Sequence, residues 1–352
     1  MKRLLFSCSL FLSVILTSNA QSTVFTSVYY PNINKAELAI IQQDYRLALT
    51  HYKSAFESVK SGFARDYRNA ILCAIQTKDN AFAFAYLEKV IMKRMDRSFF
   101  ADTAFAPLME KKAWRELMNS YDALYAKSAE GISSKLLQEL IHMEERDQFF
   151  RVQEGSYEVF GDTIAKIDVE NVTRFQQLVN IYGFPSEDLI GAYMFEQNAP
   201  YNIILHHQAQ TLSNTMYKYP TGESLAPIIE QAAQAGKCSP AHAGYLLSMQ
   251  NDRLYNYNAF GILQLSVNGV IRPYYLLDKI PVEKLSEINI KRASIGLESV
   301  DEFRKKCQFR LDNPNTPFKL SSHQNLNIWE MDEMMANDFE PDFDKVVPTL
   351  QK

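Results

Sequence analysis

Cysteine is scarce in this chain of 352 residues, which contains four. Cys8 lies in the apolar leader described below, and Cys73, Cys238 and Cys307 lie far apart in the remainder. The three cysteines outside the leader are few and odd in number, which excludes a small domain built on a disulfide framework. Three interpretations stay open: buried thiols, one disulfide between Cys238 and Cys307, or a catalytic thiol, although none of the three lies in a recognisable nucleophile motif.

Long apolar segments are absent after residue 20, so we expect no membrane-spanning helix. Residues 1–20 combine a basic start at Lys2 and Arg3, an apolar run over residues 4–17 and the small residues Ser18-Asn19-Ala20. This pattern is typical of a secretory signal peptide, and its apolar run is too short to span a bilayer. We expect cleavage after Ala20 and export to the periplasm or the extracellular space. An uncleaved leader or a lipid anchor at Cys8 is the alternative.

An excess of basic residues is also absent. The 37 basic residues less Lys2 and Arg3 leave 35, against 41 acidic residues, so the mature chain has a net charge of −6. Such a chain has no electrostatic footprint for nucleic acid, and we expect no nucleic-acid partner.

Proline is missing between Pro31 and Pro107, as long paired helices require. Apolar residues from Leu38 to Ala55 recur at spacings of three and four, which is the helix period. The pattern continues over residues 70–91 and 114–124, so residues 34–125 are predicted to be helical.

An internal repeat lies in this region. Residues 44–55 align with residues 79–90 at an offset of 35, with alanine at Ala48 and Ala83 and large residues at Tyr52 and Leu87. The offset is close to the roughly 34-residue period of helical-hairpin solenoids. The segment therefore resembles degenerate tetratricopeptide repeats. That resemblance implies stacked helical hairpins and a protein or peptide partner; a purely structural helical lead-in is the alternative.

The second part of the chain is also mostly helical in pattern, with one change of period. Ser133 or Ser134, Ser239-Pro240 and Ser299 are expected to begin helices, and Gly183 and Gly296 to end them. Helices are predicted over residues 134–153, 171–182, 203–210, 225–235, 239–249 and 282–295, with a last one after Ser299. Residues 262–272 around Asn268-Gly269 predict a β-hairpin.

We therefore predict a mainly α protein: tetratricopeptide-like hairpins followed by a helical domain that carries a small β-hairpin. The predicted organisation is a signal peptide (1–20), a repeat region (21–128), a helical domain (129–312) and a partly flexible acidic tail (313–352). Trp329 could instead hold part of the tail on the domain.

Polar residues within the apolar segments of the second domain are candidates for chemistry. His142 and Glu145 lie one helical turn apart and could share a metal ion, although a solvated face is the commoner outcome. Of His206 and His207, one should face inward, either as a core histidine or as a base. Asp252-Arg253 is either an ion pair that anchors the hairpin or part of a site.

The order of landmarks in this domain resembles an uncharacterised bacterial domain family of mostly helical fold and no established activity. The matching residues are Met143-Glu144-Glu145-Arg146-Asp147-Gln148 with Arg151, Asp168 with Asn171, Gly183-Phe184-Pro185-Ser186 with Ile190-Gly191, Leu205-His206-His207, Tyr245-Leu246 with Asp252-Arg253, Phe260-Gly261, and Arg292 with Gly296-Leu297. The chain departs from the family pattern at His206, Asn258, Ile262 and Leu263, where polar residues other than these are usual, which puts a complete catalytic site in doubt.

Three classes of function follow. The first is an exported scaffold or binding protein, favoured because nucleophile elbows, phosphate loops and strong metal spacings are missing. The second is a hydrolase-like enzyme, and the third is an envelope component that only packs against partners. The hydrolase-like alternative has a definite site: we expect a cluster beside Phe260-Gly261, with no metal and no cofactor, formed by His207, Asp147, Arg151, Asp168 and Asp252.

Overall fold

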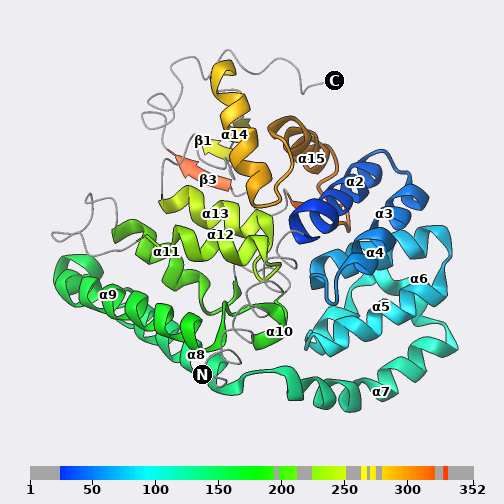
Figure 1. Cartoon of the computed structure of the whole chain (residues 1–352), viewed down its shortest axis with the longest axis horizontal. Coiled ribbons are helices and arrows are strands. Elements are labelled where there is room, and N and C mark those ends of the chain that lie inside the picture. Colours follow the sequence, from blue (N-terminus) through cyan, green and yellow to red (C-terminus); the bar gives the residue numbers. More distant parts are fainter. Residues whose placement is uncertain are drawn as a thin grey trace, which may run out of the picture.

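The computed structural model of this protein describes residues 24–193, 198–211, 224–250, 263–267, 270–274, 280–321 and 328–331. These residues are mainly helical, as the sequence predicted (Figure 1). The predicted signal peptide lies outside the described residues, as do Asp252-Arg253 and Phe260-Gly261.

One half of the molecule, blue to cyan in Figure 1, is the N-terminal helical region. Its elements are the π-helical turn η1 (Phe25–Tyr29), the helices α2 (Tyr30–Ile41), α3 (Tyr45–Ser58), α4 (Ala64–Thr77), α5 (Asn80–Met92), α6 (Ala106–Met109) and α7 (Lys112–Ser128), and the 3₁₀ turns η2 (Arg97–Ala101) and η3 (Thr103–Phe105).

Two pairs of packed helices in this half, α2 with α3 and α4 with α5, are joined by turns of the same geometry. Gln43 and Lys78, 35 residues apart, both adopt a left-handed backbone, with φ of 60° and 62°. The next residues, Asp44 and Asp79, cap the following helix, each accepting a hydrogen bond from a main-chain N–H three residues on, at 3.0 and 3.2 Å. The internal repeat thus coincides with a repeated turn.

The core of the N-terminal half draws on the far end of the chain. Phe318 and Leu320 are 4% and 1% exposed, and they belong to the same apolar cluster as helices α2 to α7. The Phe318 ring stacks on Tyr45 at 5.6 Å between centroids. The predicted partly flexible acidic tail, residues 313–352, therefore includes a packed segment at residues 318–321. The acidic residues after 331 lie outside the described part of the chain.

The other half, green in Figure 1, holds a second apolar core. Its elements are the 3₁₀ turn η4 (Ala129–Gly131) and the helices α8 (Ser134–Phe149), α9 (Ser156–Tyr182), α10 (Glu187–Ile190), α11 (Asn202–Thr211), α12 (Ala226–Gln234) and α13 (Pro240–Gln250). Helix α9 begins at Ser156 rather than at the predicted Asn171, because Gly161 and the β-branched residues before Asn171 weaken the local helix signal while packing on α8 stabilises the segment.

The C-terminal elements lie beside both halves. A turn at Gly296 joins helix α14 (Val282–Ser294) to helix α15 (Val300–Asp312), and Ser299 forms a capping box with Glu302. Strands β1 (Leu263–Val267) and β2 (Val270–Tyr274) pair antiparallel, with Val267 opposite Val270. Strand β3 (Ile328–Met331) pairs parallel with β1, which gives the strand order β2-β1-β3.

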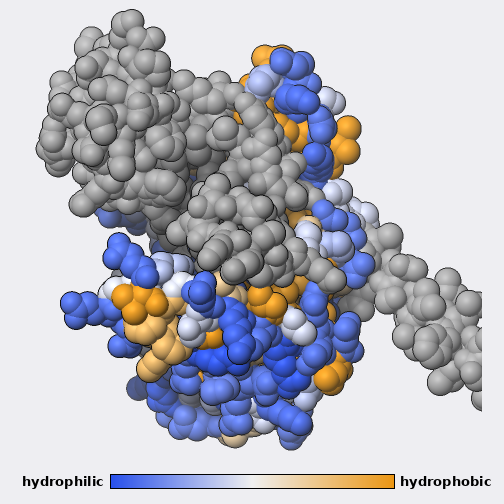
Figure 2. Space-filling view, turned by 90° about the vertical axis from the view of Figure 1, so that its left-hand side faces the viewer, coloured by the Kyte–Doolittle hydropathy of each residue, from blue (hydrophilic) through white to orange (hydrophobic). Residues whose placement is uncertain are grey.

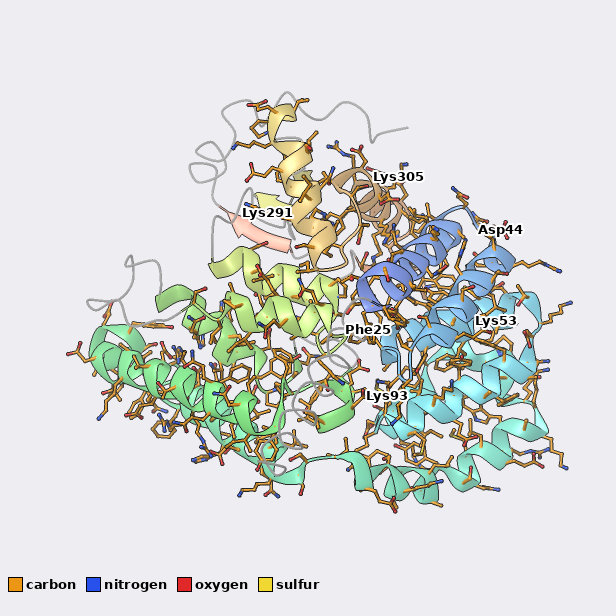
Figure 3. All side chains as sticks on the ribbon, viewed as in Figure 1. Phe25, Asp44, Lys53, Lys93, Lys291 and Lys305 are labelled. Atoms are coloured by element: carbon orange, nitrogen blue, oxygen red, sulfur yellow. The ribbon has the colours of Figure 1, made fainter. Side chains whose placement is uncertain are left out.

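Buried ion pairs join the N-terminal half to the C-terminal helices and to the second half. Lys306 of α15, 1% exposed, donates to Glu37 of α2 at 2.6 Å and lies 3.3 Å from Glu298. Lys93, at the end of α5 that faces α10 (Figure 3), pairs with Glu187 at 3.0 Å and Asp188 at 3.1 Å. Attraction between paired buried charges fixes the relative placement of the halves, since breaking one pair leaves an uncompensated charge.

The three described cysteines are buried and none forms a disulfide, so the alternative of a Cys238–Cys307 disulfide is wrong. Burial raises the pKa of the Cys73 thiol, and it raises that of Cys307 to about 12. Both thiols are therefore protonated near neutral pH, which leaves them inert as nucleophiles. Among the described residues, no helix combines the length and the apolar character that a bilayer crossing needs.

Candidate functional site

Three helices bring polar side chains to one buried point. Asp147 continues the inward stripe of α8, eleven residues after Leu136, and Asp168 lies on the buried face of α9. His207 lies two residues after the buried Leu205 in α11. A polar side chain on an apolar stripe must find a partner in the core, because burial without one costs free energy.

Asp147 and His207 form a hydrogen-bonded dyad. The Nδ1 atom of His207 lies 2.7 Å from Oδ1 of Asp147. An ionised carboxylate only accepts, so Nδ1 carries the proton and Nε2 is left to accept one. The Asp147 side chain is 1% exposed and that of His207 is 10% exposed. The imidazole is therefore the end of the dyad that solvent or a ligand can reach.

Arg151 ties the dyad to Asp168. Its Nη2 donates to both carboxylate oxygens of Asp168, at 2.7 and 2.8 Å. Its Nη1 donates to the main-chain oxygen of Asp147 at 2.7 Å and lies 3.0 Å from the Oδ2 atom of that residue. Nε donates to the hydroxyl of Tyr157 at 3.0 Å. The guanidinium thus holds Asp147 in position for His207.

Burial and charge act in opposite directions in this cluster. Burial raises the pKa of Asp168, and Arg151 works against that rise. Burial alone would lower the pKa of Arg151, but the carboxylates of Asp168 and Asp147 outweigh it and raise the pKa. The two carboxylates and one guanidinium leave a single negative charge beside the imidazole, which a proton arriving on His207 would balance.

The same atoms are close enough to hold a metal ion. One ligand atom from each of Asp147, Asp168 and His207 lies within 4.8 Å of the others. Arg151, however, already binds both oxygens of Asp168 and faces Asp147, so its guanidinium supplies the positive charge that a metal would bring. His142 and Glu145, the other metal candidates, are both exposed on α8 and do not join this cluster, which agrees with the alternative of a solvated face.

A second aromatic and histidine group adjoins the dyad and was not foreseen from the sequence. The ring of His206 lies 5.6 Å from that of His207, and its Nδ1 is 3.0 Å from the hydroxyl of Tyr245 on α13. Tyr245 stacks on His242, which is fully buried, and burial lowers the pKa of His242 to about 3. In the sequence, the only signal for this group is that His242 and Tyr245 lie three residues apart on one predicted helix.

Other landmarks of the family resemblance lie away from the cluster or outside the described residues. At Gly296, with φ of 87°, an added Cβ would lie 2.1 Å from the Tyr30 ring, so glycine permits close packing there. Arg292 is buried and donates to the main-chain oxygen of Glu298 at 2.6 Å. These two residues therefore act in packing. Asp252 and Phe260-Gly261 lie outside the described residues, so the predicted position beside the hairpin stays a prediction.

The surface outside this site is largely hydrophilic where Figure 2 shows it, on the α9 side of the molecule, and apolar residues gather there only in small groups. Comparisons of the chain with family models, with curated proteins and with solved structures give no match, so the case for a function depends on the geometry of the site alone.

Proposed function

We propose that the second part of the chain, residues 129–312, carries a hydrolytic acid-base site in which His207 is the base and Asp147 orients it. The observation that carries this proposal is the 2.7 Å hydrogen bond between His207 Nδ1 and Asp147 Oδ1, made within a buried charged cluster. A purely packed core does not need such a cluster, because apolar residues of similar volume stabilise a core as well or better.

The arrangement supports one sequence of proton transfers. Nε2 of His207 takes a proton from a water molecule while the water oxygen forms a bond to the electrophilic carbon or phosphorus of the substrate. The resulting imidazolium is stabilised by Asp147, and it then returns the proton to the leaving group as that bond breaks. Asp147 is the only hydrogen-bond partner of His207 among the residues that the structure describes, so Nε2 is free for this exchange.

A panel of p-nitrophenyl esters and phosphates, with release of p-nitrophenol as the readout, tests the proposal. We expect His207→Ala to lower hydrolysis about 10²-fold or more, and Asp147→Asn to lower it less, without loss of the folded state in a thermal melt. His51→Ala is the matched control, because His51 is a partly buried histidine near Asn32 on the far half of the molecule. No hydrolysis above background, or equal rates for wild type and His207→Ala, would contradict the proposal.

A second candidate function is the binding of a protein or peptide partner by tetratricopeptide-like hairpins at residues 21–128. The repeated turns at Gln43-Asp44 and Lys78-Asp79 support it, as does the complete burial of Ala48 and Ala83. Capture of one partner by the full chain, lost on substitution of exposed residues of α3 or α5, would support this role. If a variant altered only in α3 captures the partner as well as a variant altered only in α9, partner binding by the hairpins is contradicted.

We also propose that the protein is exported with cleavage after Ala20, on the strength of the leader pattern at residues 1–20. N-terminal sequencing of the exported protein should then begin at Gln21. A mature chain that still begins at Met1 would contradict cleavage.

A further inference from the structure

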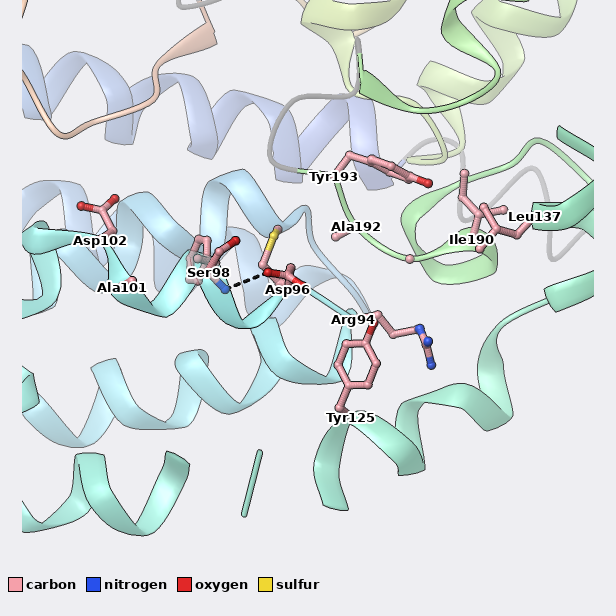
Figure 4. A pocket seen from close by; sticks show the side chains of 13 residues that line it. Arg94, Asp96, Ser98, Ala101, Asp102, Tyr125, Leu137, Ile190, Ala192 and Tyr193 are labelled. Atoms are coloured by element: carbon pink, nitrogen blue, oxygen red, sulfur yellow. Dashed lines mark hydrogen bonds between the residues drawn. The ribbon is translucent and has the colours of Figure 1, made fainter. Parts of the chain in front are cut away.

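A cavity of about 730 Å³ opens between the N-terminal half and the second half, apart from the proposed acid-base site. Its volume lies in the range of small-molecule sites. Its wall combines the segment after α5, the turn η2, the end of α7, the start of α8 and the segment after α10 (Figure 4). None of the four residues of the acid-base cluster lines it.

Hydrogen bonds and ion pairs join the two halves beside this cavity and fix their separation. Next to its wall, the main-chain N–H of Ala192 donates to the oxygen of Lys93 at 2.8 Å, and Lys93 is paired with Glu187 and Asp188. Gly191, with φ of 91°, faces the stem of Arg94, where an added Cβ would lie 3.4 Å from the Arg94 Cβ. The cavity is therefore preformed by the same contacts that join the halves, which limits the ordering that a ligand must cause.

The charged side chains of the cavity wall differ in the partners they have. Asp96 accepts a hydrogen bond from the main-chain N–H of Ser98 at 2.8 Å, and Asp102 pairs with Arg68 at 2.6 Å. Arg94 differs from Asp102, since no carboxylate pairs with its guanidinium in the part of the chain that the structure describes. Its guanidinium carbon lies 4.4 Å from the centre of the Tyr125 ring. Figure 4 shows the side chain extending past Tyr125 toward Ile190 and Leu137.

Apolar side chains form another part of the cavity wall. Met95, Phe99 and Ile190 are buried in the chain, and Leu137 is partly buried, yet all four contribute to the wall. A guanidinium steadied by an aromatic ring and bordered by apolar side chains suits a ligand with a planar anion at one end and an apolar body.

We propose that this cavity binds a carboxylate attached to an apolar body, and that Arg94 binds the carboxylate. Two sources share this chemistry: a medium-chain fatty acid and the free carboxyl end of an apolar peptide. Neither assignment depends on the proposed hydrolytic site.

Calorimetric titration of the full chain with matched acids and amides tests the proposal. The probes are decanoate with decanamide, and N-acetyl-Leu-Phe with its C-terminal amide, each to about 5 mM. We expect at least one acid to bind and its amide to bind about tenfold more weakly or worse, since the amide lacks the charge. Binding of decanoate alone identifies a fatty acid as the ligand class, and binding of the peptide alone identifies a peptide end.

Two variants and a matched control locate the binding. Arg94→Gln should weaken binding of the acid about tenfold or more, and Ala101→Trp, at an exposed position of the wall, should weaken it by filling space. Arg97→Gln should leave binding unchanged. Arg97 is also an arginine over a tyrosine ring, at 4.5 Å from the centre of Tyr121, but it pairs with Asp122 and does not line the cavity.

The proposal is overturned if neither acid binds the folded wild-type chain, if an amide binds as tightly as its acid, or if Arg94→Gln and Arg97→Gln bind equally well. A thermal melt of each variant shows whether the protein remains folded.

Discussion

Asp168 is the residue on which the charge balance of the acid-base cluster depends most. It offers both carboxylate oxygens to Arg151, whose side chain is 6% exposed. We predict that Asp168→Asn lowers the free energy of unfolding by roughly 3 kcal/mol or more, because the guanidinium then stays buried with its main partner removed. Urea denaturation measures the change. Asp162→Asn, at an exposed position of the same helix, is the control and should change little; equal effects would show that the Arg151 pair adds nothing.

Glu298 makes the stability of the fold depend on pH, through its contact with Lys306, which joins α15 to α2. Burial opposes its charge, but Lys306 and Arg292 hold its pKa down at about 2, below the ordinary 4.5. A carboxyl whose pKa is lower in the folded state stabilises the fold above the unfolded pKa and loses that effect as pH falls through the folded pKa. The window is therefore about pH 4.5 to 2, and the contribution is about 3 kcal/mol.

We predict that the difference in unfolding free energy between wild type and Glu298→Gln is largest above pH 5 and shrinks toward pH 2. Denaturant titrations at several pH values measure it. Glu283→Gln, at an exposed position of α14, should differ from wild type by a small and constant amount. A difference for Glu298→Gln that stays constant with pH would contradict the role of its charge.

At the scale of the helix, α5 has one face that admits only a small side chain. Ala83 is 0% exposed, whereas Ala85, two residues on, is exposed. We predict that Ala83→Leu lowers the free energy of unfolding by about 1–3 kcal/mol, because extra methylene groups would displace packed neighbours. Thermal and urea denaturation check this, with Ala85→Leu as the control. An unchanged melting temperature for Ala83→Leu would mean that the neighbouring helix moves aside without cost.

The helix boundaries that the sequence predicts well are those set by local chemistry. Ser133, Ser299 and the Ser239-Pro240 pair begin helices, and Gly183 ends one, because capping bonds and left-handed backbone involve neighbours in the chain. The start of α9 was missed, since there packing against another helix decides the conformation and local propensity does not.

In the candidate site, too, locally encoded features could be predicted and long-range contacts could not. Asp147, Arg151, Asp168 and His207 could be named in advance because each is a polar landmark in an apolar or capped segment, and the structure brings the four together. Their role in catalysis stays a prediction. The ion pair of Lys306 with Glu37 could not be foreseen, because its partners are 269 residues apart and no local pattern links them.

At the scale of the whole molecule, the N-terminal core is completed by a segment that follows the last helix. We predict that Phe318→Ala lowers the free energy of unfolding by about 3–5 kcal/mol, as expected for the loss of a buried phenyl ring. The loss should appear as earlier exposure of the N-terminal helices in hydrogen exchange. Phe149→Ala removes a ring that is 56% exposed and is the control. Loss of protection confined to residues 313–321 would contradict a shared core.

The return of Phe318 and Leu320 to helices α2 to α7 also orders the events of synthesis. A ribosome releases the N-terminal helices before the second half, but two side chains of their core are made only after the second half. Part of the apolar surface of those helices therefore stays exposed while the entire second half is made. Chains in this condition are the ones that chaperones bind. The core of the N-terminal half is therefore completed after the second half has been made, although its helices precede that half in the chain.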